Sequence, residues 1–210
     1  MKIVVAIPTG DRVNGILKVI EKWRKACDFD IAVYTWDAET KKVVESKVDY
    51  LFEGPLQSFA INQNLMAKEL DWDVFICGAD DLFPDFGINL IEKVCSQNSG
   101  KVIWVKDGFL NQQPTHVIIT REWYDKHGYI FDEQFEHNFC DTDLFMLARK
   151  DNEVVKCFQI GFDHRHPLKT GKKPDAIYRL GASSYAADMR RFQQKHPVNI
   201  QTEIQEVIVD

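Results

Sequence analysis

The sequence predicts an α/β fold, in which a mixed but mostly parallel sheet is flanked by helices. Short apolar runs that suit buried strands alternate with longer segments whose apolar residues recur at helical spacing, giving a β-α-β-α-β order through the first half. The chain has 210 residues, which is a usual size for a single domain with its own core. Right-handed crossovers would join the parallel strands, and some strands of the second half are expected to be antiparallel.

The first half supplies the strands of the predicted Rossmann-like sheet. Strands are predicted over residues 2–7, 31–36 and 74–77, with a weaker one over 43–52, and helices over 13–26 and 57–70. Pro84 suits the first turn of another helix, which would carry Ile88, Leu90, Ile91 and Val94 inward.

The second half is less regular. Strands are predicted over residues 102–105, 117–120 and 154–162, helices over 121–127, 141–149 and 183–195, and a loop over 164–175. We expect residues 1–182 to form the domain and residues 183–210 to add a helix and tail packed on it.

Composition narrows the classes of function. The net charge of −6 argues against broad electrostatic binding to nucleic acid or to an anionic membrane, although a local basic patch is compatible with it. The five cysteines are scattered without C-x-x-C spacing, which favours a reduced, cytoplasmic protein over a disulfide or zinc framework. No apolar run is long enough to span a bilayer, and no leader segment is apparent.

Two adjacent carboxylates follow the strand at 74–77. Asp80 and Asp81 follow Gly78 and Ala79, at the carboxyl end of a buried strand, where open α/β sheets bind ligands. Two such charges are costly unless a cation pairs with them, and hard oxygen ligands suit Mg²⁺ or Mn²⁺. Asp80 is the main predicted ligand, with Asp81 a second ligand or a hydrogen-bond partner. The alternative is an exposed Asp-Asp turn that caps the next helix.

Several short motifs occur in an order that resembles a known family. They are Ile3-Val-Val-Ala-Ile-Pro-Thr9 with Arg12, Asp37, Asn64, Gly78-Ala-Asp-Asp81, Phe131-Asp-Glu133, Cys140-Asp-Thr-Asp143 and His164-Arg-His-Pro167. In this order the chain, to about Tyr178, resembles glycosyltransferases of the GT-A fold, and is similar to glycosyltransferase family two. Two motifs depart from the family, because Asp-x-Asp is replaced by Gly78-Ala79-Asp80 and Glu-Asp by Cys140-Asp141.

The resemblance implies transfer of a sugar from a nucleotide-diphosphate sugar to an acceptor hydroxyl. A Mn²⁺ or Mg²⁺ ion bridging the two phosphates would stabilise the charge that develops on the leaving group. Asp141 would take the acceptor proton as general base and give inversion, with Asp143 as the fallback. The alternative for Asp141 is an ordinary helix N-cap.

Nucleotide recognition is expected at the first two strands. Pro8 and Thr9 end the first strand, and Arg12 can reach a phosphate or the base. Asp37 ends the second strand, where its carboxylate can accept from the base; in the family this suits uridine, so a UDP-sugar is the expected donor. The resemblance adds Asn64 and Ala79 to the donor site. Arg12 and Asn64 could instead be surface residues of helices.

The loop that follows the strand at 154–162 carries two histidines and three lysines. A neutral imidazole is a competent metal ligand, and the resemblance implies that a late histidine completes the metal site. His166, which precedes Pro167, fits better than His164; both could instead be surface residues. Lys172, together with Lys169 and Lys173, could close over the diphosphate, or could simply form a solvated basic loop.

Two other classes of function stay open from sequence. A nucleotidyltransferase would share the sheet and the paired acids, although Pro-Thr-Gly-Asp after the first strand lacks the usual glycine-rich basic loop. A non-catalytic sugar-nucleotide or carbohydrate-binding module would keep the donor site without the base. The acceptor is unknown and could be a glycan, a small molecule or a modified nucleic-acid base in a phage-like system.

Overall fold

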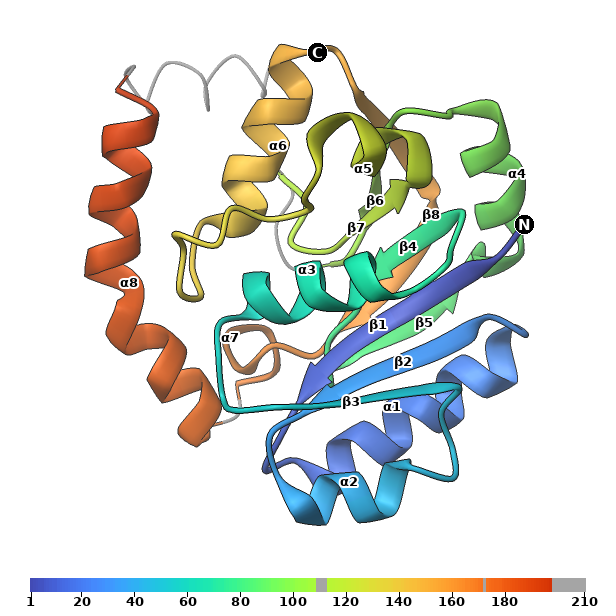
Figure 1. Ribbon diagram of the computed structural model, residues 1–210, viewed down its shortest axis with the longest axis vertical. Helices are drawn as coiled ribbons and strands as arrows, with labels where there is room; N and C mark the ends of the chain where they lie inside the picture. The colour runs from blue at the N-terminus through green and yellow to red at the C-terminus, as the bar shows by residue number, and fades with distance from the viewer. Residues whose placement is uncertain (109–112, 172, 198–210) are drawn as a thin grey trace.

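One sheet of eight strands forms the centre of the computed structural model, which describes residues 1–108, 113–171 and 173–197 (Figure 1). The strand order across the sheet is β3-β2-β1-β4-β7-β6-β8-β5. The strands are β1 (Ile3–Thr9), β2 (Asp30–Thr35), β3 (Tyr50–Glu53), β4 (Val74–Cys77), β5 (Leu82–Phe86), β6 (Val102–Lys106), β7 (Val117–Thr120) and β8 (Val154–His164).

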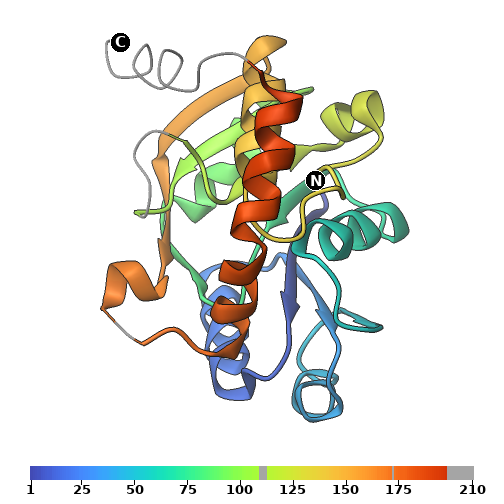
Figure 2. The ribbon, with the colours of Figure 1, turned by 90° about the vertical axis from the view of Figure 1, so that its left-hand side faces the viewer.

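Helices cover both faces of this sheet, as Figures 1 and 2 show. They are α1 (Val13–Ala26), α2 (Ala38–Val44), α3 (Phe59–Glu69), the 3₁₀ turn η1 (Ile88–Leu90), α4 (Ile91–Gln97), α5 (Arg121–His127), α6 (Cys140–Lys150), α7 (Pro167–Thr170) and α8 (Ala176–Lys195). Buried residues of α1, α2 and α4 pack on one face, and those of α3, α5, α6 and α8 pack on the other. Side chains from Ile3 to Ile7 of β1 enter the two cores in turn, and these residues are all apolar.

The strand directions decide where a ligand can bind. Strands β1, β2, β3 and β4 are mutually parallel, β7 is antiparallel to β4 and to β6, and β8 is parallel to β6 and antiparallel to β5. The carboxyl ends of β1, β2, β4, β6 and β8 therefore lie along one edge of the sheet, together with the first residues of β5 and β7. The predicted mostly parallel, mixed α/β sheet is confirmed.

The predicted strand over residues 43–52 is wrong for most of its length. Residues 38–44 form helix α2, because the Asp37 carboxylate caps it by accepting from the backbone of Thr40 at 2.7 Å. Thr40 and Val44 then face inward, one helical turn apart. Only Tyr50–Glu53 pairs as a strand, alongside β2.

The helix expected to begin at Pro84 is also absent at that point. Pro84 lies in β5, at the end of the sheet order, and the pairing with β8 is irregular between Pro84 and Phe86. Proline lacks an N–H and is tolerated in an edge strand or at a bulge, which explains the strand. The helical turns start only at Ile88.

The end of the chain is more helical than expected. The predicted loop over 164–175 contains the single turn α7, and α8 starts at Ala176 rather than residue 183, because Asp175 caps it by accepting from the backbone of Tyr178 at 3.1 Å. The expected boundary between domain and tail, at residue 182, therefore falls inside α8. The tail from residue 198 lies outside the described residues.

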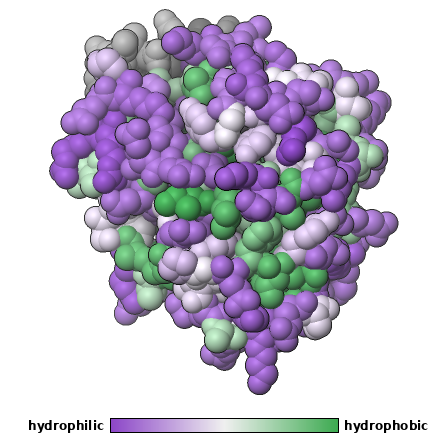
Figure 3. Space-filling model, in the orientation of Figure 1, coloured by the Kyte–Doolittle hydropathy of each residue, from purple (hydrophilic) through white to green (hydrophobic). Residues whose placement is uncertain are grey.

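The surface seen in Figure 3 is largely hydrophilic, with apolar areas interspersed across its middle. The apolar side chains of the strands are mostly inside the two cores. Among the described helices, none combines the length and apolar character that a membrane crossing would require.

Candidate active site

The two adjacent carboxylates lie between β4 and β5, at the carboxyl edge of the sheet. Asp80 is 8% exposed and accepts hydrogen bonds from Thr9 Oγ1 and from Arg12 Nη1, each at 2.7 Å. Burial and the charge of Asp81 raise the pKa of Asp80, and the Arg12 guanidinium opposes that rise. Asp80 is thus buried and partnered, and Asp81 is half-buried, so the pair is not an exposed turn.

Asp81 has different partners. The Tyr178 hydroxyl donates to its carboxylate, and His164 Nε2 lies 3.5 Å from Oδ2. Burial opposes ionisation of Asp81, but His164 and Tyr178 together hold its pKa below the usual value. Burial and the Asp81 charge raise the pKa of the Tyr178 phenol, which therefore stays protonated and donates.

Arg12 joins this carboxylate pair to the first turn of α8. Its Nε and Nη2 donate to Asp175 at 2.8 and 2.7 Å, while Nη1 holds Asp80. The guanidinium also lies over the Tyr178 ring, 4.6 Å from the centroid. Residues separated by more than 160 positions are thereby held together, and the beginning of α8 covers the carboxylates.

Three imidazoles meet beside Asp81. The ring centroid of His164, the last residue of β8, is 4.6 Å from that of His116 and 5.5 Å from that of His166. His116 directly precedes β7 and donates from Nδ1 to the carbonyl of Cys77 at 2.9 Å, since a carbonyl can only accept. Burial lowers the pKa of His116 to about 4, so its ring is neutral at pH 7.

Sequence reasoning did not identify His116, Asp107 or Thr115 as site residues. Each flanks a strand on the antiparallel side of the sheet, where the order β7-β6-β8 differs from the chain order. In the sequence, each of these residues is a polar residue next to a predicted strand. This position indicates a site residue only when the strand directions are known.

Asp141 lies in the first turn of α6, which begins at Cys140 after Phe139, a residue with φ of 66°. Burial raises the pKa of Asp141 to about 6, with a further contribution from Asp107 and opposing hydrogen bonds from Thr142. The Asp141 carboxylate accepts from the backbone N–H of Thr142 at 2.8 Å. Its side chain does not cap the helix from the N-cap position, which Phe139 occupies.

Asp143 is 1% exposed and holds the end of α8. Lys195 Nζ donates to one of its oxygens at 2.9 Å, and His196 Nε2 lies 2.7 Å from the other. This carboxylate is buried in an ion-paired cluster, whereas Asp141 is only partly buried.

Two residues expected at the nucleotide base have well-defined partners. Asp37 accepts from the backbone of Thr40 and, at 2.9 Å, from the backbone of Asp11 in the loop that follows β1. Burial opposes its ionisation, but the Thr40 hydrogen bonds lower the pKa of Asp37. Asn64 accepts from the backbone of Ile130 and Phe131 and donates to the Phe131 carbonyl and to Glu133. Its amide is therefore committed to the 130–133 loop.

The remaining predicted donor residues lie near the carboxylates or outside the described chain. Pro8 is buried in β1, and Ala79 is half-buried beside Asp80. Lys169 is exposed and paired with Asp163 at 3.0 Å. Lys172 lies outside the described residues.

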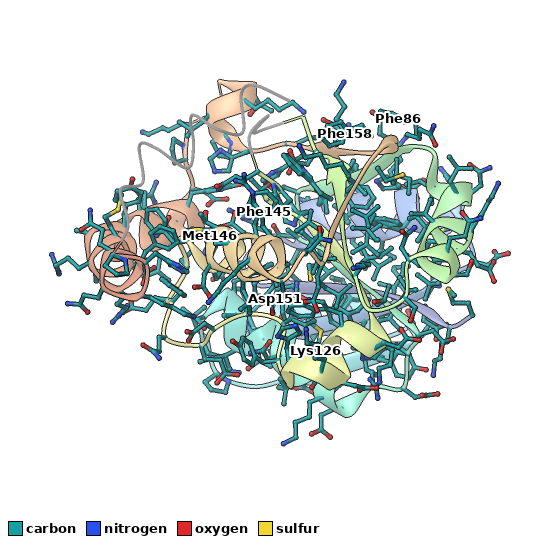
Figure 4. All side chains as sticks on the ribbon, turned by 90° about the horizontal axis from the view of Figure 1, so that it is seen from above. Phe86, Lys126, Phe145, Met146, Asp151 and Phe158 are labelled. Carbon is teal, nitrogen blue, oxygen red and sulfur yellow. The ribbon has the colours of Figure 1, made fainter. Side chains whose placement is uncertain are left out.

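A second group of possible ligands lies elsewhere, within the part of the chain that the structure describes: His127, Asp151 and Glu153. The Lys126 ammonium donates a hydrogen bond to Glu153 and lies 3.8 Å from Asp151. Figure 4 labels Lys126 and Asp151 in this region. Trp123 and His127 also form hydrogen bonds with the Glu153 carboxylate. The Lys126 ammonium already supplies the positive charge beside these carboxylates, so we interpret the group as an ion-pair network rather than a metal site.

The donor set at the carboxyl edge suits a divalent ion. Asp80 and Asp81 offer hard oxygen atoms and His164 offers a nitrogen, a combination typical of Mn²⁺ sites. The 3.5 Å between Asp81 Oδ2 and His164 Nε2 is close to the ~3 Å that separates neighbouring ligands of an ion with ~2.1 Å bonds. Asp81 and His164 therefore fit the implied metal as a pair. Asp80, whose carboxylate is now held by Thr9 and Arg12, would have to turn toward them to complete the site.

The sequence matches no family model and no curated protein sequence. Solved structures with a similar fold include TarS from S. aureus, with 15% identity and a TM-score of 0.66 over 88% of this chain and 39% of that one. Another is the mannosyltransferase PcManGT from Pyrobaculum calidifontis in complex with GDP-Man and Mn²⁺, with 11% identity and a TM-score of 0.60 over 77% and 56%. This chain thus spans about half, or less, of the length of those two chains.

A putative glucose-1-phosphate thymidylyltransferase from Bacillus anthracis is also similar, with 15% identity and a TM-score of 0.54 over 88% of this chain and 95% of that one. Identities this low establish the fold alone. The chain has a GT-A-like α/β fold, of the kind that glycosyltransferases and nucleotidyltransferases share, as its sequence predicted.

Proposed function

We propose that this chain is a metal-dependent glycosyltransferase that moves a sugar from a nucleotide-diphosphate sugar to an acceptor hydroxyl with inversion. The observation that carries the proposal is the approach of His164 to Asp81 at the carboxyl edge of the sheet, directly beside the buried carboxylate of Asp80. A partly buried carboxylate of raised pKa, Asp141, lies in the first turn of α6 beside that edge. Paired acids for a metal and a separate base for a hydroxyl are the two groups that sugar transfer needs.

The donor nucleotide would bind at the ends of β1 and β2. Asp37 now accepts two backbone hydrogen bonds, and a carboxylate has about four lone-pair sites, so it can still accept from a base imide. This favours uridine and makes a UDP-sugar the first donor to test. Pro8, Thr9 and Ala79 would line the same site, whereas the amide of Asn64 is committed to another loop.

The metal would be held by Asp80 and Asp81 with a histidine from the end of β8. When bound, it supplies positive charge that stabilises the leaving diphosphate. Arg12 now bonds to Asp80, and Tyr178 to Asp81. Arg12 would therefore exchange Asp80 for a donor phosphate, which its planar guanidinium binds well.

Asp141 would accept the proton of the acceptor hydroxyl. Its raised pKa makes the ionised form a stronger base than an exposed carboxylate, while leaving it mostly ionised at pH 7. Attack from the face opposite the diphosphate inverts the anomeric carbon. Asp143 is the weaker candidate, because it is buried, the Lys195 ammonium neutralises it and His196 Nε2 lies within hydrogen-bond distance of it.

A thermal-shift screen tests donor binding. Ligands that bind the folded state raise the melting temperature, so UDP-glucose, other UDP-sugars and GDP-mannose are compared with and without Mn²⁺. GDP-mannose is included because one similar structure holds it. We expect a Mn²⁺-dependent rise for at least one nucleotide sugar. No rise with any donor would contradict the proposal.

A turnover assay then separates the rival functions. Release of the nucleoside diphosphate, with water or a glycan, small-molecule or modified-base acceptor, would mark a glycosyltransferase. Donor binding without release across these acceptors would mark a binding module. Release of pyrophosphate from a nucleoside triphosphate and a sugar phosphate would mark a nucleotidyltransferase, the reaction named for one similar structure.

A further inference from the structure

Two residues outside the predicted site, Asp107 and Thr115, hold His164 through hydrogen bonds. Asp107 follows β6 and is 2% exposed, and Thr115 comes shortly before β7. Thr115 Oγ1 lies 2.5 Å from Asp107 Oδ2 and 3.2 Å from His164 Nδ1. The backbone of His164 also donates to the Asp107 carbonyl at 3.3 Å.

The direction of these hydrogen bonds follows from counting protons. Two oxygens 2.5 Å apart must share a proton, and an ionised carboxylate has none to give, so the Thr115 hydroxyl donates to Asp107. A hydroxyl has one proton only. Thr115 Oγ1 must therefore accept from His164, which puts the proton of that ring on Nδ1.

The opposite nitrogen of His164 is then the one that carries a lone pair. In the neutral ring with Nδ1 protonated, Nε2 is unprotonated. Nε2 is also the atom that faces Asp81, at 3.5 Å from Oδ2. In a charged ring, the proton on Nε2 occupies the point between these two groups, and through it His164 lowers the pKa of Asp81. In the neutral ring, a metal cation can take the place of that proton.

His166 is in the opposite state. Its Nδ1 accepts from the backbone N–H of Leu168 at 3.2 Å, at the start of α7. Because a backbone N–H can only donate, Nδ1 of His166 carries the lone pair and Nε2 carries the proton. To ligate through Nε2, this ring would have to change tautomer.

We infer that Asp107 and Thr115 are positioning residues that fix the tautomer of His164 and make it, rather than His166, the imidazole ligand of the metal. This inference rests on the metal site of the proposed function. Histidines that bind metals commonly donate their second ring N–H to a fixed acceptor, and loss of that acceptor typically lowers metal affinity by about 10–100-fold.

The first test reads the tautomers directly in the metal-free protein. Long-range ¹H–¹⁵N correlation spectra of histidine-labelled protein at pH 8 distinguish the two neutral tautomers, with His164→Ser and His166→Ser giving the assignments. We expect His164 to be protonated on Nδ1 and His166 on Nε2. A His164 ring protonated on Nε2 would overturn the inference.

The second test measures the affinity for Mn²⁺ alone by calorimetry. Thr115→Val keeps the shape and the backbone bond to Asp107 but removes the hydroxyl, so affinity should fall about 10–100-fold. Thr115→Ser keeps a hydroxyl and should therefore retain most of the wild-type affinity for Mn²⁺. His164→Ser should remove binding, whereas His166→Ser, which can still cap α7, should retain it.

The results of these tests distinguish failure of the ligand assignment from failure of the proposed function. Wild-type affinity in Thr115→Val, or a greater loss in His166→Ser than in His164→Ser, would overturn the assignment, provided circular dichroism shows folded variants. Failure of the wild type to bind Mn²⁺ would overturn it too. If Mn²⁺ binds as expected but no nucleotide sugar is bound or turned over, the proposed function fails and the ligand assignment stands.

Discussion

At the scale of single residues, Asp141 differs clearly in its surroundings from Asp143, the other candidate base. Its carboxylate is partly buried, accepts from the Thr142 backbone and lacks the ion pairs that neutralise Asp143 two positions later. Asp141→Asn keeps the shape and removes the basicity. It should leave nucleotide-sugar affinity nearly unchanged and lower turnover by about 10²-fold or more, the scale of general-base catalysis. Donor-hydrolysis assays and calorimetry measure the two quantities, and Asp143→Asn should cost less turnover. Full activity in both variants would exclude the inverting base mechanism.

The raised pKa of Asp141 predicts the pH dependence. Only the ionised carboxylate acts as a base, so kcat/KM should rise with pH through about pH 6 and then level off. The sign for stability is opposite: a pKa raised by folding favours the folded state at low pH, and this contribution is lost as pH rises through about 6. A pH–rate profile with its inflection near pH 4, the ordinary value for aspartate, would contradict this assignment.

Asp80 should be needed for metal binding. Asp80→Asn removes one negative charge at the site while keeping a side chain that Thr9 and Arg12 can contact. We expect Mn²⁺ affinity, measured by calorimetry, to fall by more than about tenfold, since carboxylate charge is the main attraction for a hard cation. Asp85→Asn on the exposed part of β5 is the matched control. Equal affinity in both variants would remove Asp80 from the metal site.

Among the elements, α8 depends on one buried carboxylate. Asp188 is 0% exposed and accepts from the backbone N–H groups of Glu136, His137 and Asn138 as well as from Arg191. Burial opposes its ionisation, but these backbone hydrogen bonds lower the pKa of Asp188. The stability that it contributes is therefore present at neutral pH and is lost as pH falls below the usual aspartate range.

Replacing Asp188 by Ala should destabilise the protein by about 3 kcal/mol, because buried N–H donors lose their acceptor. Urea unfolding followed by circular dichroism measures the change. Asp71→Ala, at a side chain that is 90% exposed, should change the unfolding free energy by less than about 0.5 kcal/mol. If the two variants unfold at the same urea concentration, Asp188 does not anchor α8.

At the scale of the whole molecule, α8 joins the loop after β1 to the segment around the start of α6. Its N-cap residue, Asp175, holds Arg12, and near its other end Phe192 packs on Phe139 and Phe135, with centroid distances of 5.3 and 6.5 Å. Figure 2 shows α8 running along one side of the molecule. We expect that a chain ended after residue 182 exposes this aromatic cluster and loses its cooperative melting transition. A chain ended after residue 197 should melt like the full chain. Equal melting temperatures for the two would show that residues 183–197 are dispensable for the fold.

The sequence by itself determined the parallel half of the sheet, because apolar strands buried on both faces and helices of period 3.6 are local patterns. It also identified Asp80 and Asp81, since a carboxylate pair after a buried strand is a local signal with a chemical meaning. The predictions for residues 43–52 and for Pro84 were wrong. A helix cap at Asp37 decided the first conformation and an edge position in the sheet decided the second, and the apolar pattern shows neither.

Only the tertiary structure decided which distant side chains face those carboxylates. The sheet order sets β6, β7 and β8 in a sequence that the chain order does not give, and this brings Asp107, Thr115 and His164 into one hydrogen-bonded series. The contacts from Arg12 and Tyr178 span 68 and 97 positions. Such partners depend on strand direction and register, which are set by packing of the whole sheet and leave no periodic trace in the sequence.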